Sequence, residues 1–233
     1  MALPREHLQH APIAEALVDF RVRPRNGLVT AVFDPLVAAI RPRFPNQSPM
    51  IAFEAQFGVV AGKPLAPQAT EAAAGWVVRS SEAGAVAQFR LDGFTYSKLR
   101  PYTSWDEVFE SAIELWRSYV ELAAPPEVAR IGVRYINQLE LPAGELSDFL
   151  TAAPVAPPDV TQNLREFLSR VVVWDAGRGA TAIITQALGT PLAPDRVRVL
   201  LDIDVFREGA FSPKSEELAR LFQPLHNLKN EIF

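Results

Sequence analysis

The sequence contains no cysteine among its 233 residues. This absence excludes disulfide bonds, thiolate zinc sites, iron–sulfur clusters and a cysteine nucleophile. Histidine is also scarce: His7, His10 and His226 are the only three, and no HExxH pair occurs. We therefore expect no histidine-based metal centre and no cofactor, and we favour a surface or helix-end position for His226 over a role as general base.

Long apolar runs and net positive charge are absent as well. No window contains eighteen uninterrupted apolar residues, and the first residues lack a basic segment followed by an apolar one. We therefore expect a cytoplasmic protein with no membrane partner. The 23 Lys and Arg are outnumbered by 27 Asp and Glu, which gives a net charge of -4. Since no overall positive field attracts phosphate backbones, nucleic acid is not an expected partner.

Common catalytic motifs are missing too. The chain has no GxGxxG, Walker loop, GxSxG elbow or kinase motif, so nucleotide-dependent and serine-hydrolase chemistry lack their usual scaffolds. Whether the protein is an enzyme stays open at this point, and a non-enzymatic role is the favoured interpretation.

The two halves of the sequence repeat one order of predicted strands and helices. In the first half, 1–124, the strand Ile13–Arg23 alternates polar and apolar residues, and Asp34-Pro35 begins a short helix. The strand Met50–Val60 and a loop at 62–75 follow. Asp92-Gly93 predicts a type I′ hairpin between two further strands. Ser104 and Glu107 form a capping box for a long amphipathic helix that ends before Pro125-Pro126.

The second half, 125–233, follows the same order with an insertion. It opens with the strand Val128–Leu141, and short helices are predicted at 145–150 and 161–169. The strands Val171–Trp174, Thr181–Leu188 and Val197–Phe206 come next. Ser212-Pro213 predicts the start of a last helix, which Pro224 should kink or interrupt. The apolar stripe of that C-terminal helix suggests a homo-oligomer contact or, as the alternative, packing of the helix into the chain's own core.

This layout predicts an α+β fold with an antiparallel sheet, built from two pseudo-repeats of the form β-α-β(3–4)-α with the long helices on one sheet face. The order is similar to the saddle of the TATA-binding-protein fold, an analogy of topology that implies no function. Because only Pro125-Pro126 separates the halves, we expect them to pack together as one globular unit.

Several phrases of the sequence occur together in one protein family. They are His10–Ile13 leading into Glu15-Ala16-Leu17, Lys98–Tyr102 before Trp105, Arg130–Asn137, and the ending from Leu225-His226 to Ile232-Phe233. With them the chain resembles, over nearly its whole length, a sporadically distributed bacterial family of uncharacterised proteins. The resemblance implies no activity, cofactor or catalytic residue.

Arginines are the strongest candidate ligand-binding residues. Arg21 and Arg23 share one face of the opening strand, and Arg130 and Arg134 share one face of its counterpart in the second half. If the two strands are equivalent, these guanidinium groups line one surface that could bind phosphate or carboxylate. Acidic residues on the same faces favour the alternative of an internally paired polar sheet face. Trp76 and Trp174 are the tryptophans most open to stacking on a ligand.

Asp202 and Asp204 are the best carboxylate pair, because they lie two residues apart on one strand face beside Arg198. Such a pair could hold Mg²⁺ or perform acid–base chemistry. We favour a solvated strand face over this metal site. The leading hypothesis is therefore a binding or regulatory module that recognises a protein partner or small ligand through the exposed sheet face or the groove between the halves. A metal-dependent phosphoryl-handling or hydrolytic enzyme is the alternative, and nucleic-acid binding through the saddle is third.

Overall fold

The structure, a computed structural model, describes residues 11–56, 59–60, 63–64, 68–82, 84–142, 146–153, 166–189, 193 and 195–233. The predicted α+β class with an antiparallel sheet is confirmed. One sheet contains nine strands: β1 (Ile13–Arg23), β2 (Asn46–Gln56), β5 (Gln68–Arg79), β6 (Ala85–Arg90), β7 (Gly93–Leu99), β8 (Glu127–Pro142), β9 (Leu168–Asp175), β10 (Ala180–Leu188) and β11 (Arg196–Phe211). Two short strands, β3 (Val59–Val60) and β4 (Lys63–Pro64), form a separate pair.

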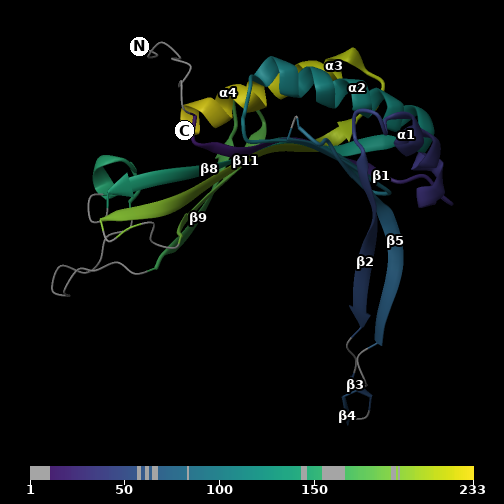
Figure 1. Ribbon diagram of the computed structural model, residues 1–233, viewed down its shortest axis with the longest axis horizontal. Helices are drawn as coiled ribbons and strands as arrows, with labels where there is room; N and C mark the ends of the chain where they lie inside the picture. The colour runs from purple at the N-terminus through teal and green to yellow at the C-terminus, as the bar shows by residue number, and fades with distance from the viewer. Residues whose placement is uncertain are drawn as a thin grey trace.

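The first strand of each half lies at the centre of the sheet. The order across the sheet is β2-β5-β6-β7-β1-β8-β11-β10-β9, and every neighbouring pair is antiparallel. The helices lie on one face, and the β2–β5 end of the sheet bends away from them, so that the opposite face is the inside of an arch (Figure 1). We call this helix-free surface the free face.

Helix α2 (Trp105–Ala123) covers β1 and β7. The predicted cap is confirmed, because the Ser104 side chain accepts a hydrogen bond from the Glu107 amide. The helix ends at Ala124, whose positive φ of 44° places it in the left-handed region. Beneath the helix, the Trp116 ring stacks on Phe20 of β1 at a centroid distance of 4.0 Å. This stacked pair anchors α2 to the centre of the sheet.

The C-terminal segment forms two helices, α3 (Glu216–Arg220) and α4 (Phe222–Ile232). The predicted start at Ser212-Pro213 is wrong, because Ser215 is the residue whose side chain caps α3. The interruption expected near Pro224 is present, and Pro224 lies in the first turn of α4, where its missing N–H removes no helical hydrogen bond. Phe222 and Leu225 are buried in the core. The apolar stripe considered for a homo-oligomer contact is thus used within the chain.

Several local predictions need correction. The loop expected at 62–75 is wrong at Lys63–Pro64, which form β4, and from Gln68 onward, because β5 begins there and pairs with β2. Pairing across the sheet has overridden the weak local pattern. The helix expected at 145–150 is a 3-10 turn over Leu146–Asp148 (η2), as far as the described residues extend. Of the helix expected at 161–169, residues 161–165 lie outside the described residues, and Leu168 and Ser169 belong to β9.

The hairpin at Asp92-Gly93 is present, but its turn is one residue earlier than predicted. Arg90 pairs with Gly93, so that Leu91 and Asp92 form the two-residue loop between β6 and β7. In the described residues, Ala124 is the only non-glycine with positive φ, which excludes a type I′ turn at Leu91-Asp92. A Cβ on Gly93 would lie 2.2 Å from the Phe20 carbonyl oxygen, so the glycine is needed for close approach of β1.

The remaining helical elements complete the helix-bearing face. The 3-10 turn η1 (Thr30–Phe33) leads directly into α1 (Asp34–Ala39), and Phe33 and Val37 of this unit are buried. Among the described residues, no helix is both long enough and apolar enough to cross a bilayer.

Candidate binding face

Strand alternation places the predicted arginines on the free face. In β1, Val18 and Phe20 are buried beneath the helices, and the residues between them point to the other side of the sheet. The register pairs Arg21 directly with Arg130, so the first strands of the two halves bring their guanidinium groups to the centre of the sheet. Arg21 and Arg130 thus lie side by side on one surface of the β1–β8 pair.

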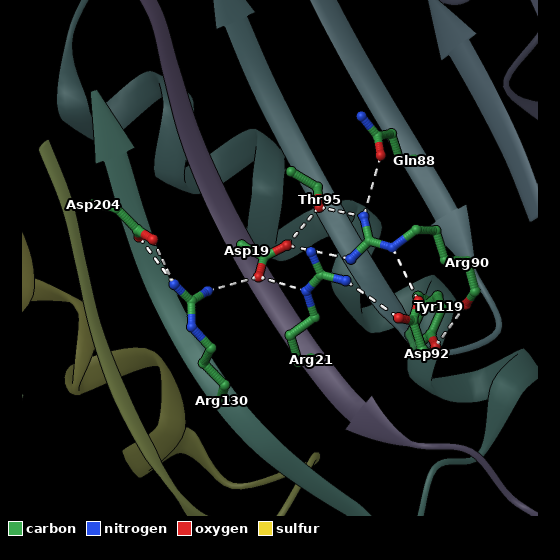
Figure 2. A network of polar contacts seen from close by, with 9 residues as sticks. All are labelled: Asp19, Arg21, Gln88, Arg90, Asp92, Thr95, Tyr119, Arg130 and Asp204. Atoms are coloured by element: carbon green, nitrogen blue, oxygen red, sulfur yellow. Dashed lines mark hydrogen bonds and ion pairs between the residues drawn. The ribbon is translucent and has the colours of Figure 1, made fainter. Parts of the chain in front are cut away.

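Asp19 is the centre of the resulting polar network (Figure 2). One of its carboxylate oxygens accepts hydrogen bonds from Arg21 Nε at 3.1 Å and Arg130 Nη1 at 3.0 Å. The other accepts from Thr95 Oγ1 at 2.6 Å and Arg90 Nη2 at 3.3 Å. Only 14% of the Asp19 side chain is exposed. Four donors therefore converge on one shielded carboxylate: Arg21 of the same strand, and one residue from each of β6, β7 and β8.

Arg90 connects the network with the helix-bearing side through its backbone carbonyl group. It is buried, and it donates to Asp92 Oδ1 at 3.1 Å, to Gln88 Oε1 at 3.2 Å and to Thr95 Oγ1 at 2.6 Å. The Tyr119 hydroxyl of α2 donates to the Arg90 carbonyl oxygen at 3.0 Å, and burial raises the pKa of that hydroxyl. Tyr119 thus couples α2 to the strand that carries the buried arginine (Figure 2).

Sequence reasoning missed Arg90. Its only local signal is its position two residues before Asp92 at the hairpin. Its principal charged partner, Asp19, is 71 positions away in the sequence.

The predicted carboxylate pair is occupied by arginines of β8. Arg130 Nη2 donates to both oxygens of Asp204, at 2.8 and 3.0 Å, while its guanidinium lies 4.1 Å from the centroid of the Phe206 ring. Arg134 binds Asp202 through two hydrogen bonds, at 2.5 and 2.8 Å. Burial raises the pKa of Asp204, although the nearby guanidinium groups oppose the rise. Hydrogen bonding to Asp202 raises the pKa of Arg134.

These contacts argue against the alternative of a metal site at Asp202 and Asp204. The Asp202 and Asp204 oxygens that would ligate a cation already accept charge-assisted hydrogen bonds from Arg134 and Arg130. Within the described residues, no group of three or more His, Asp and Glu side chains is arranged to hold a metal ion. The geometry therefore favours the paired polar face over a cation site.

The other predicted residues lie away from the network. Arg23 forms a separate ion pair with Glu127 at 3.1 Å, and 73% of its side chain is exposed. Trp76 lies on the helix-bearing side, where its indole nitrogen donates to Asp34 at 3.0 Å. Trp174 is on the edge strand β9 and is 63% exposed. The structure therefore separates the two tryptophans, and Trp174 is the more exposed of the two.

His226 lies on α4 and is partly buried. Its ring stacks on Trp105 at a centroid distance of 4.3 Å. This position differs from the exposed or helix-end site that the sequence suggested.

A groove on the helix-bearing side is formed where residues of both halves meet. Its volume is about 290 Å³, and its apolar lining includes Phe20, Trp116 and Leu218. Arg117 and Lys214 on its rim are balanced by Glu121 and Glu216, which also line it. This balance gives the groove no preference for a ligand of one charge.

The charged side chains at the centre of the free face are paired with one another. Arg21, Arg90, Arg130 and Arg134 each contact at least one carboxylate, so the network is fixed and close to neutral. Fixed ion pairs require little reorganisation when a partner covers them, and they define a pattern of donors and acceptors across the sheet.

The chain was compared with protein-family models and with curated proteins. No protein-family model matches the chain, and no curated protein matches it.

Proposed function

We propose that the protein is a non-enzymatic binding or regulatory module that recognises a protein partner through the free face. The observation that carries the proposal is a nine-stranded sheet whose helices lie on one face, leaving an arched surface with a network of fixed ion pairs at its centre. An ordered surface of this extent suits a folded partner, because contacts spread over several strands can contribute together.

The shape of this surface favours a protein over a small ligand. The strands β8 and β11 each span sixteen residues and lie side by side on the face. The groove of about 290 Å³ is lined by α2 and by residues 213–219, on the other side of the sheet. Small-molecule sites are clefts that bury most of the ligand, whereas the free face presents its polar groups along neighbouring strands of a broad sheet.

The charge pattern also favours a protein over nucleic acid. A phosphate-binding surface needs lysines and arginines that are available to phosphate oxygens. On the free face, Arg130 contacts both Asp19 and Asp204, and Arg134 contacts Asp202. A nucleic-acid backbone would have to displace these carboxylates.

We further infer that the two halves are pseudo-repeats related across the β1–β8 pair. Outward from β1 the strands follow as β7, β6 and β5, and outward from β8 they follow as β11, β10 and β9. In each half the first strand is therefore central, and the last strand before the long C-terminal helical segment lies next to it. This order supports the analogy with the saddle of the TATA-binding-protein fold that the order of elements suggests.

The proposal is tested by comparing which proteins co-purify with tagged versions of the chain from cells that express it naturally. The test variant, Arg134→Gln with Asp202→Asn, removes both charges of one free-face ion pair and leaves neither partner unpaired. The matched control, Arg43→Gln with Glu114→Gln, removes an ion pair between the segment after α1 and helix α2 on the helix-bearing side. Circular dichroism establishes that all three proteins are folded.

We expect a protein that co-purifies with the wild type and the control variant and is depleted from the free-face variant. An identical set of proteins with all three versions contradicts the proposal, as does the absence of any protein enriched by the wild type.

A further inference from the structure

The two edges of the sheet differ in how they are protected. A sheet edge presents unpaired N–H and C=O groups, and natural proteins usually block such an edge with proline, a bulge or charge. The edge strand β2 contains Pro49, and its register with β5 shifts between Met50 and Ile51. The opposite edge strand, β9, contains neither proline nor glycine and pairs with β10 over eight consecutive residues without a shift. Although β9 carries Arg170 and Asp175, by the criteria of proline and bulges it is the open edge.

The side chains of β9 are apolar and exposed on both faces of the sheet. Of the ten large hydrophobic residues that are exposed in the described part of the chain, five belong to this strand. Their exposed fractions run from 45% to 75%, and the residues are Leu168, Val171, Val172, Val173 and Trp174. Single exposed apolar residues are ordinary, but a cluster on a regular strand is typical of an interaction surface. The β-branched residues also favour further strand pairing.

The sequence of β9 complements itself when two copies run antiparallel. With Val172 on a two-fold axis perpendicular to the sheet, Val171 of each copy faces Val173 of the other, on the same side of the sheet. On the opposite side, Arg170 of each copy faces Trp174 of the other. Arg170 makes no ion pair with the described residues, and a guanidinium placed over an indole gains a cation–π contact. The register thus pairs apolar with apolar residues and gives each Arg170 a partner.

From these observations we propose that the protein forms a two-fold symmetric dimer through β9. The two nine-stranded sheets then join into one continuous sheet. Backbone hydrogen bonds close both open edges, and the two clusters of exposed valines cover one another. The occupant of this edge is a second copy of the chain, because β9 supplies a matching side chain at every facing position from Arg170 to Trp174 in that register.

Because the chain contains no cysteine, a single introduced cysteine reports the register in which the two β9 strands pair. Val172→Cys introduces a single thiol that faces its own copy at the two-fold axis, within the range of Cβ separations that directly opposed antiparallel residues show. Val29→Cys is the matched control, because Val29 is 57% exposed and lies outside β9. A mixture of Val171→Cys and Val173→Cys proteins tests the same register, since each of these residues faces the other and not itself.

We expect the wild type to sediment as a dimer at micromolar concentration and Val172→Cys to form a covalent dimer under mild oxidation. The mixed Val171→Cys and Val173→Cys proteins should cross-link to each other more than either does alone, and Val29→Cys should remain uncross-linked. Val172→Lys, which places like charges opposite each other, should weaken dimerisation by about tenfold or more, whereas Val172→Thr should retain it.

Three results overturn the proposal. The first is a wild-type protein that stays monomeric at every concentration. A wild-type protein that stays monomeric while its β9 pairs with a strand of another protein counts as the same result. The second is a dimer that Val172→Lys leaves intact. The third is cross-linking of Val172→Cys no faster than that of Val29→Cys.

Discussion

Arg130 Nη1 lies 3.0 Å from Asp19, and this ion pair joins the first strands of the two halves on the free face. The other terminal nitrogen of the same guanidinium binds Asp204 of β11. Through Thr95 and Arg90, Asp19 also contacts β7 and β6. One continuous polar network therefore spans five adjacent strands, β6-β7-β1-β8-β11, and fixes their relative positions on the side that the helices leave open.

Asp19→Ala should destabilise the protein by about 3 kcal/mol, because it leaves the buried Arg90 and the half-buried Arg130 without their shared carboxylate. The free energy of unfolding in urea measures this loss. Arg23→Ala is the control, since it breaks an ion pair whose arginine is 73% exposed and should cost less than about 1 kcal/mol. Equal losses for the two variants would show that the network does not hold the sheet.

Lys229→Met should change how stability depends on pH. Burial lowers the pKa of Lys229 to about 8, against 10.5 for an exposed lysine. Between these values the unfolded chain binds the proton and the folded chain does not, so this residue makes stability rise with pH. The wild type should gain about 2 kcal/mol from this residue between pH 8 and pH 10.

In Lys229→Met that rise should disappear, and the variant should be more stable than the wild type at pH 7. Urea titrations at several pH values compare the two proteins. Burial also raises the pKa of Tyr102, Tyr119 and Tyr135, which makes stability fall as the pH approaches and passes 10. The comparison between the two proteins is therefore made below pH 10, where both share this fall. A variant with the same slope as the wild type below pH 10 would exclude Lys229 as its source.

The elements with strong local patterns could be predicted from the sequence. The alternation of β1 and the Ser104 cap of α2 both depend on neighbouring residues, and both are confirmed. In contrast, β5 begins in an alanine-rich segment that becomes a strand only by pairing with β2. Its local pattern carries no signal for that pairing, which is why the sequence predicted a loop there.

The residues of the candidate site could likewise be predicted only in part from the sequence. Strand alternation predicts that Arg130 and Arg134 share a face, and that Asp202 and Asp204 do so on another strand. It does not predict that β8 and β11 are neighbours, which is what makes these residues partners. The burial of Arg90 depends on Asp19, 71 positions away in the sequence, and no local pattern contains that distance.

Gly93→Ala should destabilise the protein by about 2 kcal/mol or more, because the added Cβ would lie 2.2 Å from the Phe20 carbonyl oxygen and force β7 away from β1. Gly27→Ala is the comparison. Gly27 also has positive φ, but a Cβ there meets nothing within 4 Å, so its cost should be limited to about 1 kcal/mol of backbone strain. Thermal unfolding of the two variants ranks the costs, and the opposite ranking would contradict this account of the hairpin.

Ser104→Ala should cost about 1 kcal/mol, because the Glu107 amide loses its hydrogen-bond acceptor at the start of α2. Ser104→Asp restores an acceptor and should recover most of the loss. Urea unfolding of the pair distinguishes a capping effect from a general loss of side-chain contacts. If the aspartate variant were as unstable as the alanine variant, the cap would not be the source of the effect.

Site-specific photo-cross-linking in cells that express the protein naturally tests the binding role of the free face most directly. A photoreactive residue replaces Glu140, which is on the free-face side of β8 and has 53% of its side chain exposed, or Glu110, which is exposed on α2. We predict a discrete cross-linked protein from position 140 and none from position 110. Cross-links from position 110 alone, or the same products from both positions, would contradict recognition through the free face.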